Sequence, residues 1–294
     1  MHNRPFSNVV IFGGSGKLGS SLASIMAGNF CTVITLDRSA CDVREHDQVR
    51  YCIEQAKPDV VINAVAYNGL DACENDPQQA MAVNTLFPRL LAELSILHGF
   101  LLVHISSDAV FSGTGSDCYH ESSAAAPINM YGLTKYGGDC FVSAIAKHYY
   151  IVRISVQFGS TPGKAQFVEK MLEQIQQGRN SLKVSDDIVA SPSYSRDVAE
   201  KIKELIDRQS PFGLYHIANE GKASLYELIR ELARIMGSDV IVEPVPHSTF
   251  PSRSLKNIHT PICSEKIPPL RPWKDALMAY CLELQVKGKG QAHG

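Results

Sequence analysis

The sequence lacks closely spaced pairs of cysteines, and its histidines do not occur at the spacings that bind metals. Its eight cysteines form no C-x-x-C, and its ten histidines form no H-x-x-x-H or H-E-x-x-H. Neither a zinc site nor a compact disulfide framework is therefore indicated, and we predict no metal site. The cysteines are expected to be free thiols, as in a reducing compartment. His104, within an apolar run, is expected to be a core residue with its hydrogen bonds satisfied.

Long apolar runs and an excess of one charge are missing as well. No stretch approaches the roughly 18 apolar residues of a membrane span, and the first residues, MHNRPFSN, lack the apolar core of a signal peptide. The 28 Lys and Arg nearly balance the 30 Asp and Glu, which leaves a formal net charge of -2. Nothing global therefore attracts nucleic acid or an anionic membrane. We expect a cytoplasmic protein that binds neither.

The sequence does contain a regular alternation of apolar runs and helical patterns. Runs rich in Val, Ile and Leu occupy 8–12, 32–37, 59–66, 100–107 and 149–155. One helical pattern follows the first run after a glycine loop, and further helical patterns occupy 45–56, 76–99 and about 130–147. Continuous apolar strands separated by helices are typical of a parallel sheet covered on both faces. The alternation predicts a doubly wound α/β domain over residues 1–155.

The alternation is less regular after residue 155 and predicts a smaller lobe over 156–294. Parts of about 183–217 are expected to return to the first domain. Helices are predicted at 166–178, 196–209, 224–237 and 271–285, with a short strand at 214–218. Residues 180–195 and 243–255 are interpreted as polar or loop segments, and 286–294 as a frayed end.

A glycine-rich loop joins the first predicted strand to the first predicted helix. Gly13, Gly16 and Gly19 form G-x-x-G-x-x-G there. Glycines at such a turn let the backbone approach a pyrophosphate, whose charge the helix N-terminus stabilises. The loop is therefore predicted to bind a dinucleotide, the alternative being a plain structural turn. The cofactor-binding candidates in this loop are Gly13, Ser15, Gly16, Lys17 and Leu18.

Residues near the end of the second predicted strand bear on the choice of nicotinamide cofactor. Asp37 stands where an acid can accept hydrogen bonds from the adenine ribose hydroxyls, which favours NAD(H). Arg38 and Lys17 could instead meet a 2′-phosphate, which favours NADP(H). The sequence leaves both cofactors open. Asp42 is predicted to lie near the adenine or, equally, to be a helix N-cap or a solvated acid.

Tyr131 and Lys135 form Y-x-x-x-K in a predicted helix, which places both side chains on one face, one turn apart. A nearby cation favours phenolate over phenol. Lys135 is therefore expected to lower the Tyr131 pKa from about 10 toward working pH, where general acid catalysis is efficient. The spacing also occurs by chance, so its surroundings decide its meaning.

Ser106, Ser107 and Asp108 directly follow an apolar strand, about 25 residues before Tyr131. In a doubly wound sheet, ligands bind outside the carboxyl ends of the strands. A serine at that position can hydrogen-bond a substrate carbonyl group, and its alternative role is that of a local turn former.

Together these segments resemble the extended short-chain dehydrogenases/reductases and, within them, the dTDP-4-dehydrorhamnose reductase family. GGSGKLG resembles the family's cofactor loop, and PDVVINAVAYNGLDACENDPQQAMAVN its third strand and next helix. HISSDAVFSGTG resembles its S-T-D-Y-V-F segment, NMYGLTKYGGD its Tyr/Lys helix, and GLYHIANEG and LRPWKDAL its C-terminal half. The similarity covers nearly the whole chain.

The resemblance implies roles for individual residues. It makes Ser107 the catalytic Ser/Thr, Tyr131 the general acid and Lys135 the ligand of the nicotinamide ribose. It also implies that Ala64 and Ala66 line the cofactor groove.

The implied activity is that of an NAD(P)H-dependent oxidoreductase acting on a nucleotide-linked keto-deoxysugar. One alternative is an epimerase or dehydratase of the same fold, which would use the cofactor only transiently. Another is a cofactor-binding regulatory subunit, which would need no proton donor. A sugar nucleotide is the expected partner, and a homodimer is left open.

Two positions depart from the family's pattern. Ala109 stands where relatives usually have an aromatic residue, and Val156 where they tend to have tryptophan. If both face the sugar, the pocket is wider or loses stacking, and the parent substrate is expected to react poorly. Alternatively, one of the two is only core packing. The predicted substrate-binding residues are Asp108, Ala109, Val156 and Arg253.

Overall fold

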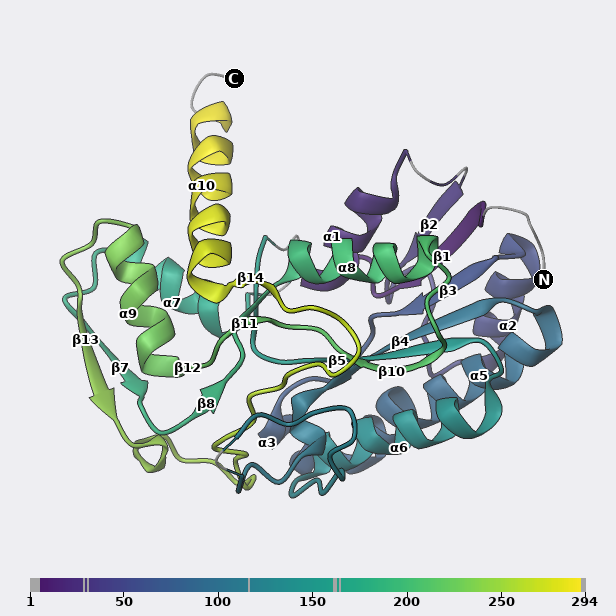
Figure 1. Cartoon of the computed structure of the whole chain (residues 1–294), viewed down its shortest axis with the longest axis horizontal. Helices are drawn as coiled ribbons and strands as arrows, with labels where there is room; N and C mark the ends of the chain where they lie inside the picture. Colours follow the sequence, from purple (N-terminus) through teal and green to yellow (C-terminus); the bar gives the residue numbers. More distant parts are fainter. Residues whose placement is uncertain are drawn as a thin grey trace.

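A six-stranded parallel sheet forms the larger lobe of the molecule (Figure 1). The computed structural model describes residues 6–28, 30, 32–115, 117–160, 163 and 165–291. The strands lie in the order β10-β5-β4-β3-β1-β2, and every neighbouring pair is parallel. They are β1 (Asn8–Phe12), β2 (Thr32–Leu36), β3 (Val60–Asn63), β4 (Leu101–Ser107), β5 (Tyr149–Ile154) and β10 (Gly213–His216).

Helices cover both faces of this sheet because its strands are apolar on both sides. Along β1, Val9 and Ile11 pack with one set of helices, whereas Val10 and Phe12 pack with the other. The first set is α1 (Lys17–Met26) and α8 (Ser195–Asp207); the second is α2 (His46–Ala56), α5 (Phe87–His98) and α6 (Met130–Ile145). Burial on both faces explains the continuous apolar runs and confirms the predicted doubly wound α/β fold.

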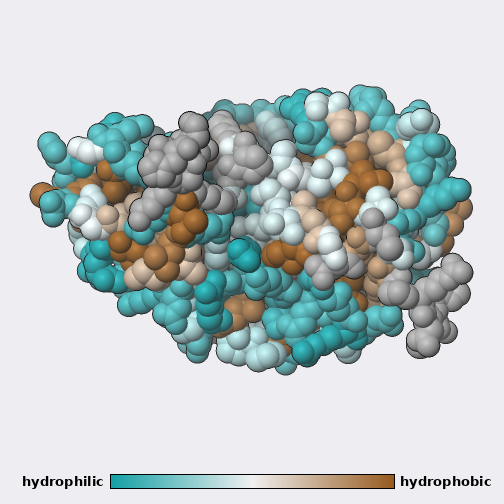
Figure 2. Space-filling model, turned by 90° about the horizontal axis from the view of Figure 1, so that it is seen from above, coloured by the Kyte–Doolittle hydropathy of each residue, from teal (hydrophilic) through white to brown (hydrophobic). Residues whose placement is uncertain are grey.

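The expectation that no stretch approaches a membrane span is wrong by length and composition alone, because the helical stretch Pro77–His98 is long and apolar enough to cross a membrane. It comprises α4 (Pro77–Met81), the π-helical turn η1 (Ala82–Leu86) and α5, and it follows the short α3 (Leu70–Asn75). However, 61% of its most apolar window is buried inside the fold, as in the core helix of a globular protein. The face seen from above is mainly hydrophilic, with apolar residues in separate patches (Figure 2).

The smaller lobe is built from two-stranded sheets and three helices around a core of its own. The sheets pair β7 (Ser181–Ser185) with β13 (Ile241–Val245), β8 (Val189–Ala190) with β12 (Ala223–Ser224), β6 (Gln157–Phe158) with β9 (Ser193–Tyr194), and β11 (Asn219–Glu220) with β14 (Leu270–Pro272). The helices are α7 (Phe167–Gln176), α9 (Leu225–Ile235) and α10 (Trp273–Gln291). The chain leaves this lobe through α8 and β10, which belong to the large sheet and its helical layer.

Two expectations about the second half, the loop at 243–255 and the frayed end, are wrong, and the stretch interpreted only as polar contains strands. Residues 180–195 contain the strands β7, β8 and β9, and residues 243–245 form the end of β13. These short strands pair with segments far along the chain, which a local pattern does not show. The expected frayed end is helical as far as Gln291, because α10 continues outward from the lobe (Figure 1). Residues 292–294 lie outside the described part.

The expectation that all cysteines are free thiols is also wrong. Cys118 and Cys263, which are 145 residues apart, form a disulfide. The free cysteines are Cys41, Cys52, Cys73, Cys140 and Cys281. Cys31 lies outside the described residues. Two loops bring these two cysteines together, and neither loop contains a sequence motif that predicts the disulfide.

Candidate active site

A single groove runs along the carboxyl ends of the strands and consists of two cavities. One, of about 280 Å³, is lined by the glycine loop and the residues after β2. The other, of about 330 Å³, contains Ser107, Tyr131 and Lys135. Gly16, Ala64 and Ala66 line both, so the two cavities adjoin. Two larger hollows, of about 600 and 710 Å³, contain none of the three catalytic candidates.

The glycine loop is shaped by close backbone approaches. Gly13 has a φ of +83°, and a Cβ there would lie 3.0 Å from the carbonyl carbon of Ala64. A Cβ on Gly19 would lie 2.0 Å from the Gly13 carbonyl oxygen, so only glycine fits. Gly16, the N-cap of α1, is less crowded, since its Cβ would meet only that oxygen, at 3.3 Å. The loop thus leaves room at the N-terminus of α1, and this cradle fits a pyrophosphate.

Two other loop residues also lie along the groove. Ser15 lines the first cavity and Leu18 the second. Leu18 is buried, so it contributes to the core under the loop as well.

Lys17 does not lie beside Asp37, where contact with a 2′-phosphate was considered for it. Its Nζ donates a hydrogen bond to the Gln157 carbonyl oxygen at 2.7 Å and forms an ion pair with Glu169 at 2.8 Å. Burial lowers the Lys17 pKa, although the attraction of Glu169 opposes this. Lys17 lines the second cavity and not the first. The hypothesis that it meets a 2′-phosphate next to Asp37 is therefore wrong.

The first cavity contains two acids and two arginines. Asp37 Oδ1 accepts hydrogen bonds from the Ser39 hydroxyl group at 2.6 Å and from two backbone N–H groups, which lower the Asp37 pKa. Asp42 is paired with Arg44, whose Nε donates to Oδ1 at 2.8 Å, and its pKa falls to about 2. Arg38 and Arg44 both line the cavity. Sequence reasoning missed Arg44, although an arginine two residues after Asp42 was a local signal.

The catalytic candidates meet in the second cavity. Ser107 ends β4, and Tyr131 and Lys135 lie on the first two turns of α6. Asn129 caps this helix by accepting a hydrogen bond from the Gly132 N–H at 2.8 Å. Ser107 hydrogen-bonds Tyr131, and Lys135 Nζ donates to the Ile105 carbonyl oxygen at 2.6 Å. One strand end and one capped helix therefore fix all three side chains.

The expected lowering of the Tyr131 pKa is wrong for this structure. Exclusion of water from the phenol raises its pKa, and the hydrogen bond between Tyr131 and Ser107 offsets this only in part. Burial lowers the Lys135 pKa to about 8, while the negative charge of Asp139 opposes that change. Helical spacing predicted the proximity of the two groups but not how far both are removed from water. Tyr131 therefore keeps its proton, as a proton donor must.

Asp108 connects three segments at the edge of the same cavity. Its carboxylate accepts hydrogen bonds from the hydroxyl groups of Ser107 at 3.1 Å, Ser155 at 2.7 Å and Thr260 at 2.9 Å. Burial raises its pKa, and these three hydrogen bonds lower it. Sequence reasoning missed Ser155 and Thr260. Thr260 lies 152 residues beyond Asp108, so no local signal could have found it.

The remaining substrate-binding candidates lie in different places. Val156 lines the second cavity, whereas Ala109 lines neither cavity and is buried in the 3₁₀ turn η2 (Asp108–Val110). Arg253 is exposed, and it hydrogen-bonds Asp71 through its backbone and Asn75 through its guanidinium, at 2.9 and 2.6 Å. It too lines neither cavity.

A buried charged cluster lies behind Lys135. Asp139 is held by Arg153, whose Nε and Nη2 each lie 3.1 Å from Oδ2. His104 Nδ1 lies 3.2 Å from the Asn63 amide, but its Nε2 has no hydrogen-bond partner among the described residues and is 3.6 Å from Asp139. The expectation that His104 is fully satisfied is therefore wrong. Burial lowers its pKa well below the usual range, so it is neutral.

Metal ligands are not grouped in the part of the chain that the structure describes. No set of three or more His, Cys, Asp or Glu side chains there could hold a metal ion.

Comparison with known proteins identifies the family. Residues 7–286 match the family model described as the RmlD substrate binding domain. A dTDP-4-dehydrorhamnose reductase of Mycolicibacterium smegmatis is 33% identical over 276 residues, 92% of this chain and 83% of its own length. The spore coat polysaccharide biosynthesis protein SpsK of Bacillus subtilis is 28% identical and covers 94% of this chain and 98% of its own.

Solved structures agree. The dTDP-4-dehydrorhamnose reductase of Bacillus anthracis, in complex with NADP, superposes with a TM-score of 0.90 at 28% identity, over 95% of this chain and 100% of its own. A Thermus thermophilus UDP-glucose 4-epimerase complex with NAD, at 17% identity and a TM-score of 0.81, shares the fold. The chain therefore belongs to the dTDP-4-dehydrorhamnose reductase family of the extended short-chain dehydrogenases/reductases.

Proposed function

We propose that this chain reduces the carbonyl group of a nucleotide-linked keto-deoxysugar with NADH or NADPH as the hydride source. The observation that carries the proposal is the meeting of Ser107, Tyr131 and Lys135 in a cavity that adjoins the glycine loop. Relatives named dTDP-4-dehydrorhamnose reductase support a sugar nucleotide as the substrate.

The described residues fit a nicotinamide dinucleotide. Gly13 and Gly16 would hold the pyrophosphate, Asp37 or the two arginines the adenosine end, and Lys135 the nicotinamide ribose. The bound nicotinamide would supply the hydride. The complex of the Bacillus anthracis relative with NADP supports this class of cofactor.

The protein's own contribution is to manage the charge and the proton at the carbonyl oxygen. Ser107 donates a hydrogen bond to that oxygen as negative charge develops on it. Tyr131, which is protonated because its pKa is raised, then transfers its phenolic proton to the oxygen. When protonated, Lys135 stabilises the phenolate that remains.

A substrate panel tests this function. Purified protein is mixed with keto-deoxysugar nucleotides and NADH or NADPH, and both the loss of nicotinamide absorbance and the sugar product are measured. We expect one cofactor molecule to be oxidised per sugar reduced. Sugar conversion without net cofactor oxidation would instead indicate an epimerase or dehydratase. Tight cofactor binding with no turnover on any sugar would indicate a regulatory subunit.

Substrate preference forms the finer part of the proposal, and Val156 now carries it because Ala109 lies outside the cavity. Without an aromatic side chain at Val156, dTDP-4-dehydrorhamnose should be a poorer substrate than a sugar with a further substituent. Stacking on one ring is worth on the order of 1 kcal/mol, or about fivefold. Val156→Trp should therefore raise kcat/KM on dTDP-4-dehydrorhamnose about fivefold relative to a bulkier sugar. Ile241→Trp, on an exposed strand of the smaller lobe, should leave that ratio unchanged.

The proposal extends to location and partners. We expect a cytoplasmic enzyme whose partner is a small sugar nucleotide, and the balanced charge gives it no general attraction to nucleic acid or an anionic membrane. A homodimer stays a prediction that light scattering can decide.

A further inference from the structure

Residues 257–263, which we name the brace, hold the two pieces that carry the catalytic side chains. Thr260 donates its hydroxyl hydrogen to Asp108, the neighbour of Ser107, at 2.9 Å. Asn257 accepts a hydrogen bond from Asn129, the cap of the helix that carries Tyr131 and Lys135, at 2.7 Å. Its amide also donates to the Phe111 carbonyl oxygen. A displacement of the brace would therefore affect both the strand end and the cap of α6.

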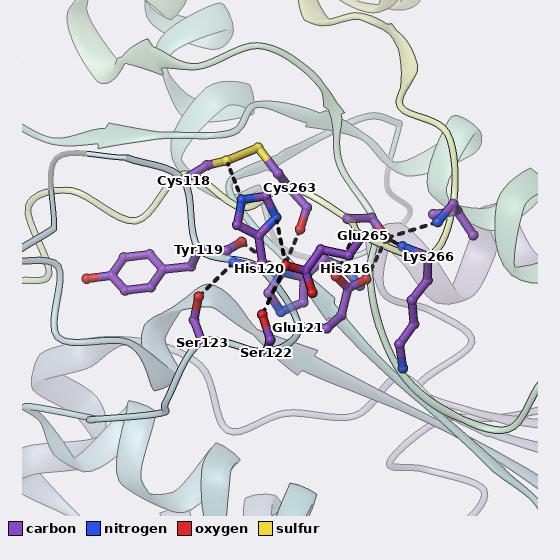
Figure 3. Close-up of polar contacts among 12 residues, drawn as sticks. Cys118, Tyr119, His120, Glu121, Ser122, Ser123, His216, Cys263, Glu265 and Lys266 are labelled. Atoms are coloured by element: carbon purple, nitrogen blue, oxygen red, sulfur yellow. Dashed lines mark hydrogen bonds and ion pairs between the residues drawn. A yellow bond between two sulfur atoms is a disulfide. The ribbon is translucent and has the colours of Figure 1, made fainter.

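The brace is fastened to the loop that precedes α6. Tyr119 N–H donates to the Pro261 carbonyl oxygen at 2.7 Å, and Cys263 N–H donates to the Tyr119 carbonyl oxygen at 2.9 Å. The Cys118–Cys263 disulfide joins the same two segments covalently (Figure 3). If the disulfide were reduced, the two backbone hydrogen bonds would remain. Reduction should thus loosen the brace rather than release it.

The disulfide has the surroundings of one that can be exchanged. Cys263 is an exposed residue, as a cysteine attacked by a thiolate from solvent must be. His120 Nε2 lies 3.7 Å from the Cys118 sulfur, where a ring N–H can stabilise a departing thiolate (Figure 3). Glu265 Oε1 lies 3.9 Å from the other ring nitrogen of His120.

We propose that Cys118 and Cys263 form a reversible thiol–disulfide exchange site whose oxidation state controls how firmly the brace holds the catalytic residues. This effect on turnover rests on the proposed reductase function. A dithiol attacks Cys263 through one thiolate; the protein S–S bond breaks, and Cys118 leaves as a thiolate that takes up a proton. The second thiol then displaces Cys263. The protein gains two electrons and two protons, and the dithiol becomes a disulfide.

The size of the effect follows from the contacts that depend on the brace. A single hydrogen bond of the kind made by Thr260 is worth about two- to tenfold. We expect kcat/KM for the sugar nucleotide to fall by about that factor when the disulfide is reduced. Cofactor affinity should change less than kcat/KM, because Lys135 is the one proposed cofactor contact on α6 and none of the brace residues lines either cavity of the groove.

The first experiment measures the oxidation state of the two cysteines and the mobility of the brace without requiring turnover. Protein equilibrated with oxidised glutathione or with dithiothreitol is alkylated and analysed by mass spectrometry, and hydrogen exchange of residues 257–263 is measured in both samples. We expect Cys118 and Cys263 to resist alkylation only after oxidation, and the brace to exchange faster after reduction. Alkylation of both cysteines in the oxidised sample, or identical exchange in the two samples, would overturn the proposal even if no sugar substrate were found.

The second experiment measures kcat/KM on the sugar nucleotide and the Kd of NADPH in both redox states. Cys118→Ser and Cys263→Ser should each have the kcat/KM of the reduced enzyme, and dithiothreitol should not change it. Cys140→Ser, which removes an exposed free cysteine, should keep the full redox response. Thr260→Val should lower kcat/KM of the oxidised enzyme by a similar factor. Reduction of this variant should then change kcat/KM less than reduction of the wild type does. Equal kcat/KM in both redox states would refute the coupling, whereas no turnover in either state would count against the proposed function alone.

Discussion

Tyr131 and Lys135 show how burial decides the protonation state of the proposed catalytic pair. Y-x-x-x-K spacing indicates that the two groups are close, and the structure confirms that both line one cavity. The pKa of each is nevertheless set first by removal from water, which favours the neutral phenol and the neutral amine. A protonated phenol is the form that can donate a proton, so the resting state suits reduction.

Removal of the Tyr131 hydroxyl group tests its role as the proton donor. Tyr131→Phe keeps the ring and deletes the transferable proton. Turnover should therefore fall by about 10²–10⁴-fold, the usual contribution of a positioned general acid, while NADPH binding and unfolding stay close to wild type. Steady-state kinetics together with cofactor titration will measure both. Turnover near the wild-type level would mean that the proton comes from another group.

Asp139 should set the pH at which Lys135 loses its charge. It is the anion that opposes the burial-driven fall of the Lys135 pKa to about 8, and Arg153 and neutral His104 are its other neighbours. Cationic Lys135 is present below that pKa and lost above it, so activity should fall as pH rises through about 8.

Asp139→Asn removes the opposing charge and should lower the Lys135 pKa further. The falling limb of kcat against pH should move to lower pH, by about one unit. A merely structural role would lower kcat at every pH without moving that limb. Glu93→Gln, an exposed acid on α5, is the matched control and should leave the profile in place.

At the scale of elements, the glycines of the loop have two different roles. Gly19 allows the backbone to turn, whereas Gly16 leaves room for the proposed cofactor. A Cβ on Gly19 would strike the Gly13 carbonyl oxygen at 2.0 Å, whereas one on Gly16 would lie 3.3 Å from it and beside both cavities. Gly16→Val should fold and lose cofactor affinity by about tenfold or more, because its side chain occupies the pyrophosphate site. Gly19→Ala should instead lower the unfolding temperature. Cofactor titration and thermal unfolding distinguish the two, and undiminished affinity in folded Gly16→Val would refute the assignment.

Elements defined by neighbouring residues were predictable from the sequence. The strands of the large sheet have continuous apolar runs because both faces are buried, and the glycine loop follows directly from G-x-x-G-x-x-G. The short strands β7, β8 and β9 were missed because each pairs with a distant segment. The disulfide and the hydrogen bond from Thr260 to Asp108 join residues 145 and 152 positions apart. Such contacts depend on the finished fold, and no local pattern encodes them.

At the scale of the whole molecule, one buried ion pair connects the cofactor loop to the smaller lobe. Lys17, the first residue of α1, reaches Glu169 on α7 and the Gln157 carbonyl oxygen on β6. Glu169 also accepts hydrogen bonds from the backbone of Gly159 and Gln166, at 3.3 and 3.2 Å. Both charged side chains are almost fully buried, so neither can exchange its partner for water. The position of the smaller lobe is thus tied to the glycine loop, for which we propose cofactor binding.

Loss of one member of this pair should cost far more than loss of a surface pair. Glu169→Gln leaves the Lys17 charge buried without an anion and should reduce the free energy of unfolding by about 3–5 kcal/mol. Arg89→Met, which breaks an exposed pair on α5, should cost less than about 1 kcal/mol. Because the variant's Lys17 pKa lies further below its unfolded value, the unfolded state binds more protons, and stability should rise with pH more steeply than in wild type. Urea unfolding followed by circular dichroism at pH 7 and pH 9 measures both effects. A variant as stable as wild type at pH 7 would mean that the two lobes are held together without this ion pair.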